Sequence, residues 1–140
     1  MTNGTMTGGC ACGAVRYEIT GEPVMAGHCQ CRDCQRMTGT GHASMLAVPA
    51  PAIRMTGTLK YHRSTADSGS TVARGFCPEC GSFISGTSSA MPQLTTVAAA
   101  SLDDPSQFHP QLVVYTCSAQ PWDRMDPALP QFERMPPMGG

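Results

Sequence analysis

Along much of the chain, apolar and polar residues alternate in short runs bounded by glycine and proline. Val15, Tyr17 and Ile19 alternate with polar residues, so a half-buried strand is predicted over 15–20, ending at the turn 21–23. Further strands are predicted at 24–31, 42–48, 53–56, 59–63, 71–76, 82–85, 94–99 and 111–117. Few windows show the 3.6-residue period of an amphipathic helix. The pattern therefore predicts a mainly β protein, a meander of short antiparallel strands.

The run 24–31 brings reactive side chains onto one of these strands. On an extended chain Cys29 and Cys31 would share one face, with His28 and Gln30 on the other. We expect the chain to turn after residue 31, so that Cys34 swings back toward the other two sulfurs. Three thiols would then converge at the end of one strand.

Length, charge and hydropathy narrow the class of protein. The 140 residues fit one domain, and we expect a flexible N-terminus at 1–8, the domain at 9–125 and a Pro-rich tail at 126–140 that is extended over the body or partly disordered. A net charge of -1 offers no basic surface for nucleic acid. No stretch approaches the ~20 apolar residues of a membrane span, and residues 1–9 lack the features of a signal peptide. We expect a cytoplasmic protein that binds neither nucleic acid nor membrane.

The cysteines carry the strongest functional signal. Seven of the eight fall into clusters of two, three and two: Cys10 and Cys12; Cys29, Cys31 and Cys34; Cys77 and Cys80. A disulfide framework is the alternative, but it is typical of secreted chains, and the cysteines within a C-x-C pair are poorly placed to bridge each other. Metal binding is therefore the favoured interpretation.

The two pairs predict one closed four-thiolate site. Cys77-Pro78-Glu79-Cys80-Gly81 is typical of a metal knuckle, and Cys10-Ala11-Cys12-Gly13 is its natural partner. Iron in a rubredoxin-like site and a redox dithiol are alternatives, but zinc fits this spacing at least as well and needs no redox partner.

The triplet predicts a second metal ion with one open coordination position. The alternative is a structural site completed by His28, His42, His62 or Cys117, although Cys117 lies in an apolar run and behaves more like a small buried hydrophobic residue. A zinc ion with an open position can bind an incoming thiol and deprotonate it. Cys29, Cys31 and Cys34 are accordingly the candidate catalytic group.

The ordered motifs resemble a known family, the glutathione-dependent formaldehyde-activating enzymes, also described as the centromere protein V/GFA domain. The resemblance is carried by Gly8-Gly9-Cys10-Ala11-Cys12-Gly13, His28-Cys29-Gln30-Cys31-Arg32-Asp33-Cys34, Phe76-Cys77-Pro78-Glu79-Cys80-Gly81 and Ser101-Leu102-Asp103-Asp104-Pro105. It implies a β-tent fold of the Mss4-like superfamily with two zinc ions. It also implies that Cys10, Cys12, Cys77 and Cys80 hold a structural zinc, and that Cys29, Cys31 and Cys34 hold a catalytic one.

The activity implied by the resemblance is that of a carbon–sulfur lyase, which condenses glutathione with formaldehyde to S-(hydroxymethyl)glutathione. The chain departs from the family pattern at Val113 and Cys117, where a histidine and a basic residue are expected. This departure weakens the transfer of substrate but leaves the metal ligands unaffected. Glutathione has two carboxylates, for which the sequence offers Arg32, Arg36, Arg54 and Arg74. The favoured interpretation of each arginine is a solvated surface cation, and Arg36 in the metal loop is the strongest of the four candidates for a glutathione contact.

The hypothesised reaction is addition of a thiol, glutathione or a similar one, to formaldehyde or another small electrophile, giving a reversible thiohemiacetal. The sequence identifies no general base, although Asp33 and His28 are near the cluster. A different class of function is a non-catalytic binding module, in which the second zinc only braces a loop. A redox sensor is a weaker alternative, because cysteines committed to zinc are protected from oxidants.

Overall fold

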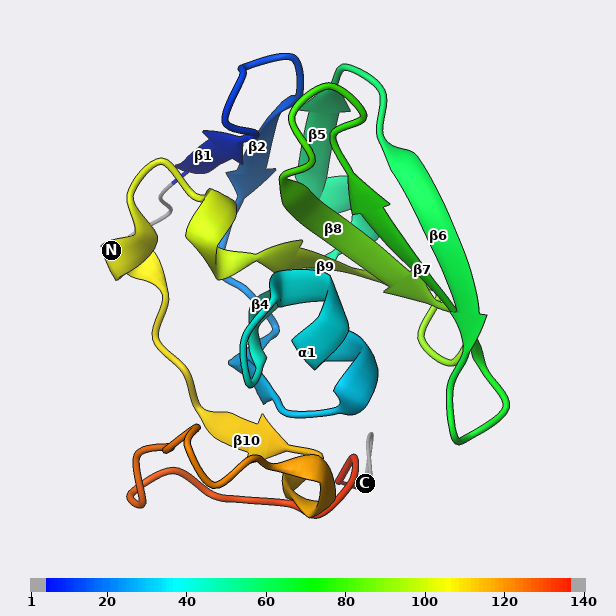
Figure 1. Cartoon of the computed structure of the whole chain (residues 1–140). Helices are drawn as coiled ribbons and strands as arrows, with labels where there is room; N and C mark the ends of the chain where they lie inside the picture. Colours follow the sequence, from blue (N-terminus) through cyan, green and yellow to red (C-terminus); the bar gives the residue numbers. More distant parts are fainter. Residues whose placement is uncertain (1–4, 137–140) are drawn as a thin grey trace.

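The computed structural model describes residues 5–136 and confirms a mainly β fold (Figure 1). The strands are β1 (Thr5–Gly9), β2 (Arg16–Thr20), β3 (Met25–Cys29), β4 (Ala43–Pro49), β5 (Ile53–Thr56), β6 (Lys60–Thr65), β7 (Thr71–Phe76), β8 (Phe83–Ser88), β9 (Leu94–Ala98) and β10 (Leu112–Val114). The helical elements are α1 (Arg32–Thr38) and the 3-10 turns η1 (Ala50–Ala52), η2 (Ala99–Ser101), η3 (Pro105–Gln107) and η4 (Thr116–Ser118). No helix in the described part of the chain is long and apolar enough to cross a membrane.

The strands form two sheets, and their order corrects the expectation of a simple meander. A three-stranded sheet has the order β1-β2-β5, and a seven-stranded sheet has the order β10-β3-β4-β9-β8-β7-β6. Only β6 to β9 follow one another as a meander, and β10 pairs with β3 in parallel. Local turn signals do not show when the chain returns to pair with an earlier strand. This topology was therefore not predicted from the sequence.

The core lies where the two sheets face each other, and β2 shows how the sequence pattern builds it. Tyr17 and Ile19 are buried while their neighbours along the strand are exposed, as the alternation predicts. They pack in one cluster with residues of the larger sheet such as Leu46 and Ile84, and this cluster includes two cysteines, Cys10 and Cys77. One end of the core is therefore made of candidate metal ligands.

A short helix replaces the expected turn after β3. The side chain of Cys31 caps α1 by accepting a hydrogen bond from the backbone N–H of Cys34, and Gly39 ends the helix with a positive φ of 79°. Buried Gln35 donates hydrogen bonds from Nε2 to the carbonyl oxygens of Gln30 and Ser118, at 2.8 and 2.9 Å. The helix is thus anchored to the exit of β3 and to the chain after β10.

The chain after β10 runs back alongside that strand, below the rest of the molecule in Figure 1. Gln131 bridges Val113 in parallel, and the Phe132 N–H donates to the Val113 carbonyl over 2.9 Å. Of the tail predicted at 126–140, the described part is therefore extended over the body, and 137–140 lie outside the described residues. In the N-terminal segment predicted at 1–8, residues 5–8 belong to β1 and 1–4 lie outside the described residues. The domain boundaries remain predictions.

Candidate metal centre

The four cysteines of the two pairs meet at one end of the molecule. The ligand atoms of Cys10, Cys12, Cys77 and Cys80 all lie within 4.8 Å of one another. The Sγ–Sγ distances are 3.6 Å between Cys10 and Cys12 and 3.8 Å between Cys12 and Cys77. Four sulfurs bound to a tetrahedral zinc at about 2.3 Å would be about 3.8 Å apart. The donor set and its spacing therefore fit zinc, and all eight cysteines are free thiols, not disulfides.

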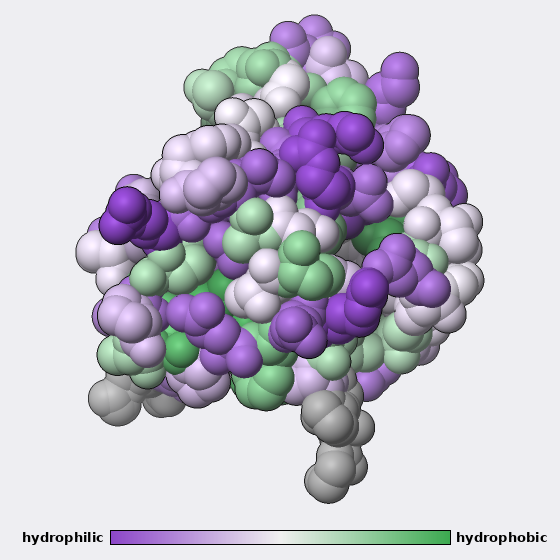
Figure 2. Space-filling view, turned by 60° about the horizontal axis from the view of Figure 1, so that its bottom comes forward, coloured by the Kyte–Doolittle hydropathy of each residue, from purple (hydrophilic) through white to green (hydrophobic). Residues whose placement is uncertain are grey.

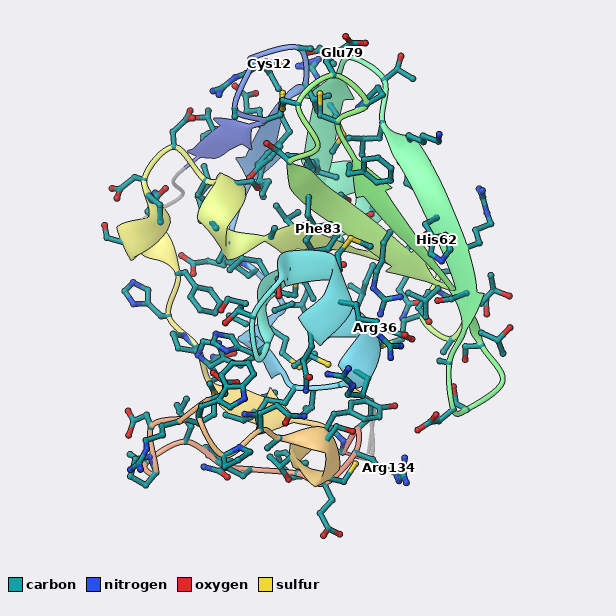
Figure 3. All side chains as sticks on the ribbon, viewed as in Figure 1. Cys12, Arg36, His62, Glu79, Phe83 and Arg134 are labelled. Carbon is teal, nitrogen blue, oxygen red and sulfur yellow. The ribbon has the colours of Figure 1, made fainter. Side chains whose placement is uncertain are left out.

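Each pair lies in a turn that is closed by a glycine with positive φ. The Gly13 N–H donates to the Cys10 carbonyl at 3.2 Å, and the Gly81 N–H donates to the Cys77 carbonyl at 2.8 Å. Both glycines have positive φ, 84° and 79°, a region that L side chains rarely adopt. In Figure 3 the Cys12 loop and the loop carrying Glu79 lie side by side with sulfur atoms between them.

Backbone N–H groups also point at these sulfurs. The Val15 N–H donates to Cys10 Sγ at 3.2 Å, and the Glu79 N–H donates to Cys77 Sγ at 3.4 Å. The Ser82 hydroxyl, 3.2 Å from Cys80 Sγ, and the backbone N–H groups of Ser82 and Cys12 together lower the pKa of Cys80 to about 5. Hydrogen bonds of this kind favour the thiolate form that binds metal.

Cys29, Cys31 and Cys34 form the second group, and their sulfurs also lie within 4.8 Å of one another. They come from the end of β3, the cap of α1 and its first turn. Hydrogen bonds from Cys29 and Cys34 lower the pKa of the Cys31 thiol, assisted by the Cys34 N–H and the positive charge of Arg74. The same contacts with Cys31 and Cys34 raise the pKa of Cys29. One thiolate is therefore favoured in the metal-free group, and a cation is needed to stabilise all three.

Within residues 5–136, no histidine, cysteine or carboxylate adds a fourth ligand atom to this triplet. His28 Nδ1 pairs with Ser44 Oγ at 2.9 Å, and His42 Nδ1 pairs with the Asp123 carboxylate at 2.9 Å. Exposed His62 lies on β6. The three histidines considered as alternative ligands thus lie outside the group.

Cys117, the remaining alternative ligand, also lies outside the group, and it corrects a second expectation. The sequence predicted a small buried side chain on a strand over 111–117, but Cys117 is exposed in η4. The strand ends at Val114 because Tyr115 adopts a left-handed backbone conformation, with φ 60°. Alternation alone does not reveal such a turn at a residue other than glycine.

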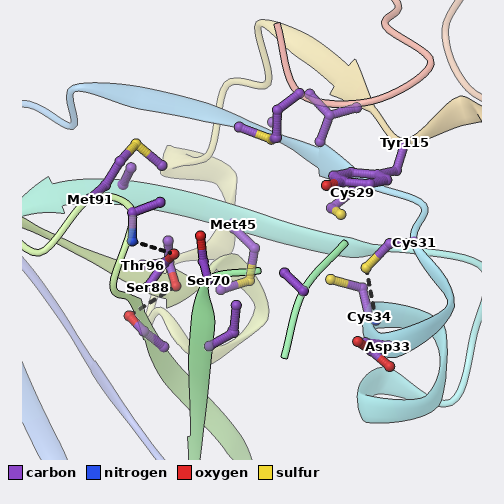
Figure 4. A pocket seen from close by; sticks show the side chains of 18 of the residues that line it. Cys29, Cys31, Asp33, Cys34, Met45, Ser70, Ser88, Met91, Thr96 and Tyr115 are labelled. Carbon is purple, nitrogen blue, oxygen red and sulfur yellow. Dashed lines mark hydrogen bonds between the residues drawn. The ribbon is translucent and has the colours of Figure 1, made fainter. Parts of the chain in front are cut away.

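A cavity of about 470 Å³ opens beside the three cysteines. They form one end of it, and apolar side chains line much of the rest (Figure 4). Arg32 and Arg74 line the cavity, whereas Arg36 and Arg54 do not and are exposed. Arg74 reaches the cysteines from β7, a proximity that the sequence does not reveal.

Tyr115 is a site residue that the sequence analysis missed. It lines the cavity, and its ring lies beside Cys29 in Figure 4. Burial raises the pKa of the Tyr115 hydroxyl, and the negative charges of Asp67, Cys29 and Cys31 act in the same direction. The hydroxyl is therefore protonated at neutral pH and is a hydrogen-bond donor. Among the described residues, Tyr115 is the only one other than glycine with a positive φ, a feature common at functional sites.

Comparisons with known proteins identify a family and a similar fold. A family model described as "Glutathione-dependent formaldehyde-activating enzyme" (GFA) matches residues 5–118. A crystal structure of a Rhodobacter sphaeroides protein, a structural genomics target, resembles this fold with a TM-score of 0.58 and 23% identity, over 73% of this chain and 94% of that chain. At this identity the likeness concerns the fold alone. The comparison with curated proteins found no match.

Proposed function

The chain belongs to the glutathione-dependent formaldehyde-activating enzyme family, and on that premise we propose that it is a zinc-dependent carbon–sulfur lyase that adds a thiol to formaldehyde or another small electrophile. Cys10, Cys12, Cys77 and Cys80 would hold a structural zinc, and Cys29, Cys31 and Cys34 a catalytic zinc. The eight free thiols also support a reducing compartment such as the cytoplasm.

The observation that carries the proposal is the difference between the two cysteine groups. Four thiols enclose one site, whereas three thiols face a cavity with no fourth ligand atom from the described residues. A structural zinc normally has four protein ligands, and a catalytic zinc has three and keeps a position for a small molecule. Zinc bound by the three thiolates would supply a place for a visiting thiol and lower its pKa.

The protein residues around the triplet have separate roles in this proposal. The three cysteines would hold the zinc at one end of the cavity, where a thiol and a small electrophile can meet. Arg74 lowers the pKa of Cys31 through its positive charge and would offset the negative charge gathered at the sulfurs. The Tyr115 hydroxyl is a candidate donor to the carbonyl oxygen as negative charge develops there.

The bond changes in the reaction balance without a further reactant. The thiol sulfur forms a bond with the carbonyl carbon, and the electron pair of the C=O π bond moves to the oxygen. The oxygen then takes up a proton equivalent to the one that the thiol lost. The product is a thiohemiacetal, and the same residues serve the reverse reaction.

The test is to measure exchange between free and adduct forms of a thiol and formaldehyde by NMR, with and without zinc-loaded protein. The spontaneous reaction is already fast, so the comparison with buffer alone is the decisive control. We expect faster exchange with the protein than with an equal concentration of the Cys34→Ser variant. Equal exchange rates with the protein, the variant and buffer would refute a catalytic role for these substrates.

A further inference from the structure

Flexible apolar side chains make up much of the cavity wall away from the three cysteines. Met25 and Met45 contribute from β3 and β4, Met91 from the loop before β9 and Leu94 from the start of β9. In Figure 4 Met91 lies at the end of the cavity away from the cysteines, and Met45 lies between the two ends. Seen from the β10 end, hydrophobic residues are visible in recesses between hydrophilic ones on the surface (Figure 2). A molecule whose sulfur reaches the cysteines would therefore rest its other end on an apolar surface.

The charged residues of the cavity lining are balanced in sign, and three of the four have a hydrogen-bond or ion-pair partner. Arg32 donates to the side-chain oxygen of Gln35, and Arg74 donates to Ser64 Oγ at 3.2 Å. Asp67 forms an ion pair with Arg134 at 2.6 Å. The remaining charged residue is Asp33, which is exposed on α1. Two cations and two anions therefore line the cavity, and they provide no cluster of positive charge for an anionic ligand.

Glutathione is a poor match for this lining. It carries two carboxylates and an ammonium group, and each charge that leaves water needs a charged or hydrogen-bonding partner. Arg74 lies at the cysteine end, where the sulfur of the thiol would be. The opposite end combines methionine and leucine with the uncharged hydroxyl groups of Ser70, Ser88 and Thr96. An alkyl or aryl group would instead be stabilised when it leaves water and packs on the apolar side chains at that end.

We propose that the thiol substrate of this protein carries an uncharged alkyl or aryl body that packs on Met25, Met45 and Met91. This inference rests on the proposed function, which places the sulfur of the thiol at the three cysteines. The inference concerns the remainder of the thiol molecule. A volume of about 470 Å³ is within the range of pockets that enclose small ligands. Methionine side chains adapt to ligands of different shape and contact aromatic rings favourably, so the cavity accepts a class of bodies rather than one.

The first experiment is an NMR titration of the zinc-loaded protein labelled with 13C in its methionine methyl groups. The probes are benzyl mercaptan and glutathione. We expect benzyl mercaptan to shift the methyl signals of Met25, Met45 and Met91, but not that of buried Met6 in the core. We also expect it to bind at least about tenfold more tightly than glutathione, which corresponds to about 1.4 kcal/mol. Equal affinities, or shifts confined to methionines outside the cavity, overturn the inference.

The second experiment compares Met91→Gln with Met125→Gln. Both methionines are partly buried, but only Met91 lines the cavity. Gln has a similar length and adds a polar amide, so Met91→Gln should weaken benzyl mercaptan binding about fivefold and leave glutathione binding unchanged. Met125→Gln should change neither. Equal effects of the two substitutions on benzyl mercaptan binding contradict a role for Met91 in holding the body.

The proposed function and this inference fail in different ways. If benzyl mercaptan binds as expected but neither thiol reacts faster with formaldehyde than in buffer, the lyase proposal fails and the apolar cavity stands. If glutathione exchange is accelerated and the two thiols bind equally well, the lyase proposal stands and this inference fails.

Discussion

The backbone N–H of Cys34 donates a hydrogen bond to the Sγ of Cys31 over 3.3 Å. Cys31 is thus both the cap of α1 and a member of the three-cysteine group, while Cys34 is a second member one turn along. The short helix and the triplet share two residues. The triplet is therefore sensitive to substitutions that leave the sheets intact.

Replacement of Cys34 by serine separates a catalytic ion from a structural one. We expect Cys34→Ser to reduce the zinc content from two ions per chain to one and to abolish acceleration of thiol addition. The strands do not depend on Cys34, so the circular dichroism spectrum should be retained. Cys117→Ser is the control, because Cys117 is exposed outside both groups, and it should keep both ions. Unfolding of Cys34→Ser would indicate that the second site braces the fold instead.

Replacement of Cys77 should have the opposite effect. Cys77 is fully buried in the core cluster and belongs to the group that joins the loop after β1 to the loop after β7. Cys77→Ser removes a ligand and places a hydroxyl in the core, so the free energy of unfolding should fall by about 3 kcal/mol or more. Denaturant unfolding of zinc-loaded protein measures this loss. A stability equal to that of Cys117→Ser would contradict a structural zinc at this position.

The knuckle glycine offers a test of local backbone geometry. Gly81 has φ 79°, and a Cβ added there would meet no atom within 4 Å, so the cost of Gly81→Ala is conformational. We expect a loss of about 1 kcal/mol of stability and weaker zinc binding at the four-cysteine group. Gly81→Asn should cost less, because asparagine adopts this conformation more readily. Competition with a zinc chelator compares the zinc affinities of the two variants. Equal losses of zinc affinity in Gly81→Ala and Gly81→Asn would contradict the conformational explanation.

The features of the protein that were predicted correctly depend on local signals in the sequence. The alternation of Tyr17 and Ile19 with polar residues predicted β2, and the spacing of the cysteines predicted which of them would gather. The family resemblance is confirmed by the match to residues 5–118. Each of these signals occupies a few consecutive residues, so neighbouring positions are enough to interpret it.

The parts that were missed depend on contacts between distant segments. The pairing of β10 with β3 and the approach of Arg74 to the cysteines arise from the order of the strands, which no short window encodes. The left-handed turn at Tyr115 was missed because a tyrosine gives no local sign of positive φ. The cavity was missed because its methionines come from segments that are distant in the sequence.

The ion pair of Arg16 and Asp103 gives a pH prediction. Arg16 donates to both oxygens of the Asp103 carboxylate, at 2.9 and 2.5 Å, and with Thr7 it lowers the pKa of Asp103 to about 2. A lowered pKa means that the contribution to stability is present above the unfolded-state pKa of about 3.9 and is lost as the pH falls toward 2. The carboxyl 13C signal of Asp103 should therefore titrate near pH 2.

Arg16→Met provides the control for this prediction. Without the guanidinium, the midpoint of the Asp103 titration should rise toward the usual range for aspartate. The pair is exposed, so its effect on overall stability should be small and should decrease with added salt. A midpoint that is the same in both proteins would show that Arg16 does not perturb this carboxyl group.

The most direct test of the central claim is a crystal structure of the zinc-loaded protein, with anomalous scattering recorded on both sides of the zinc absorption edge. The account predicts two zinc ions per chain. One should be bound by Cys10, Cys12, Cys77 and Cys80, and the other by Cys29, Cys31 and Cys34 with a solvent or ligand atom as its fourth neighbour. A fourth ligand from the protein at the second ion, or no second ion in fully reduced, metal-loaded crystals, would contradict it.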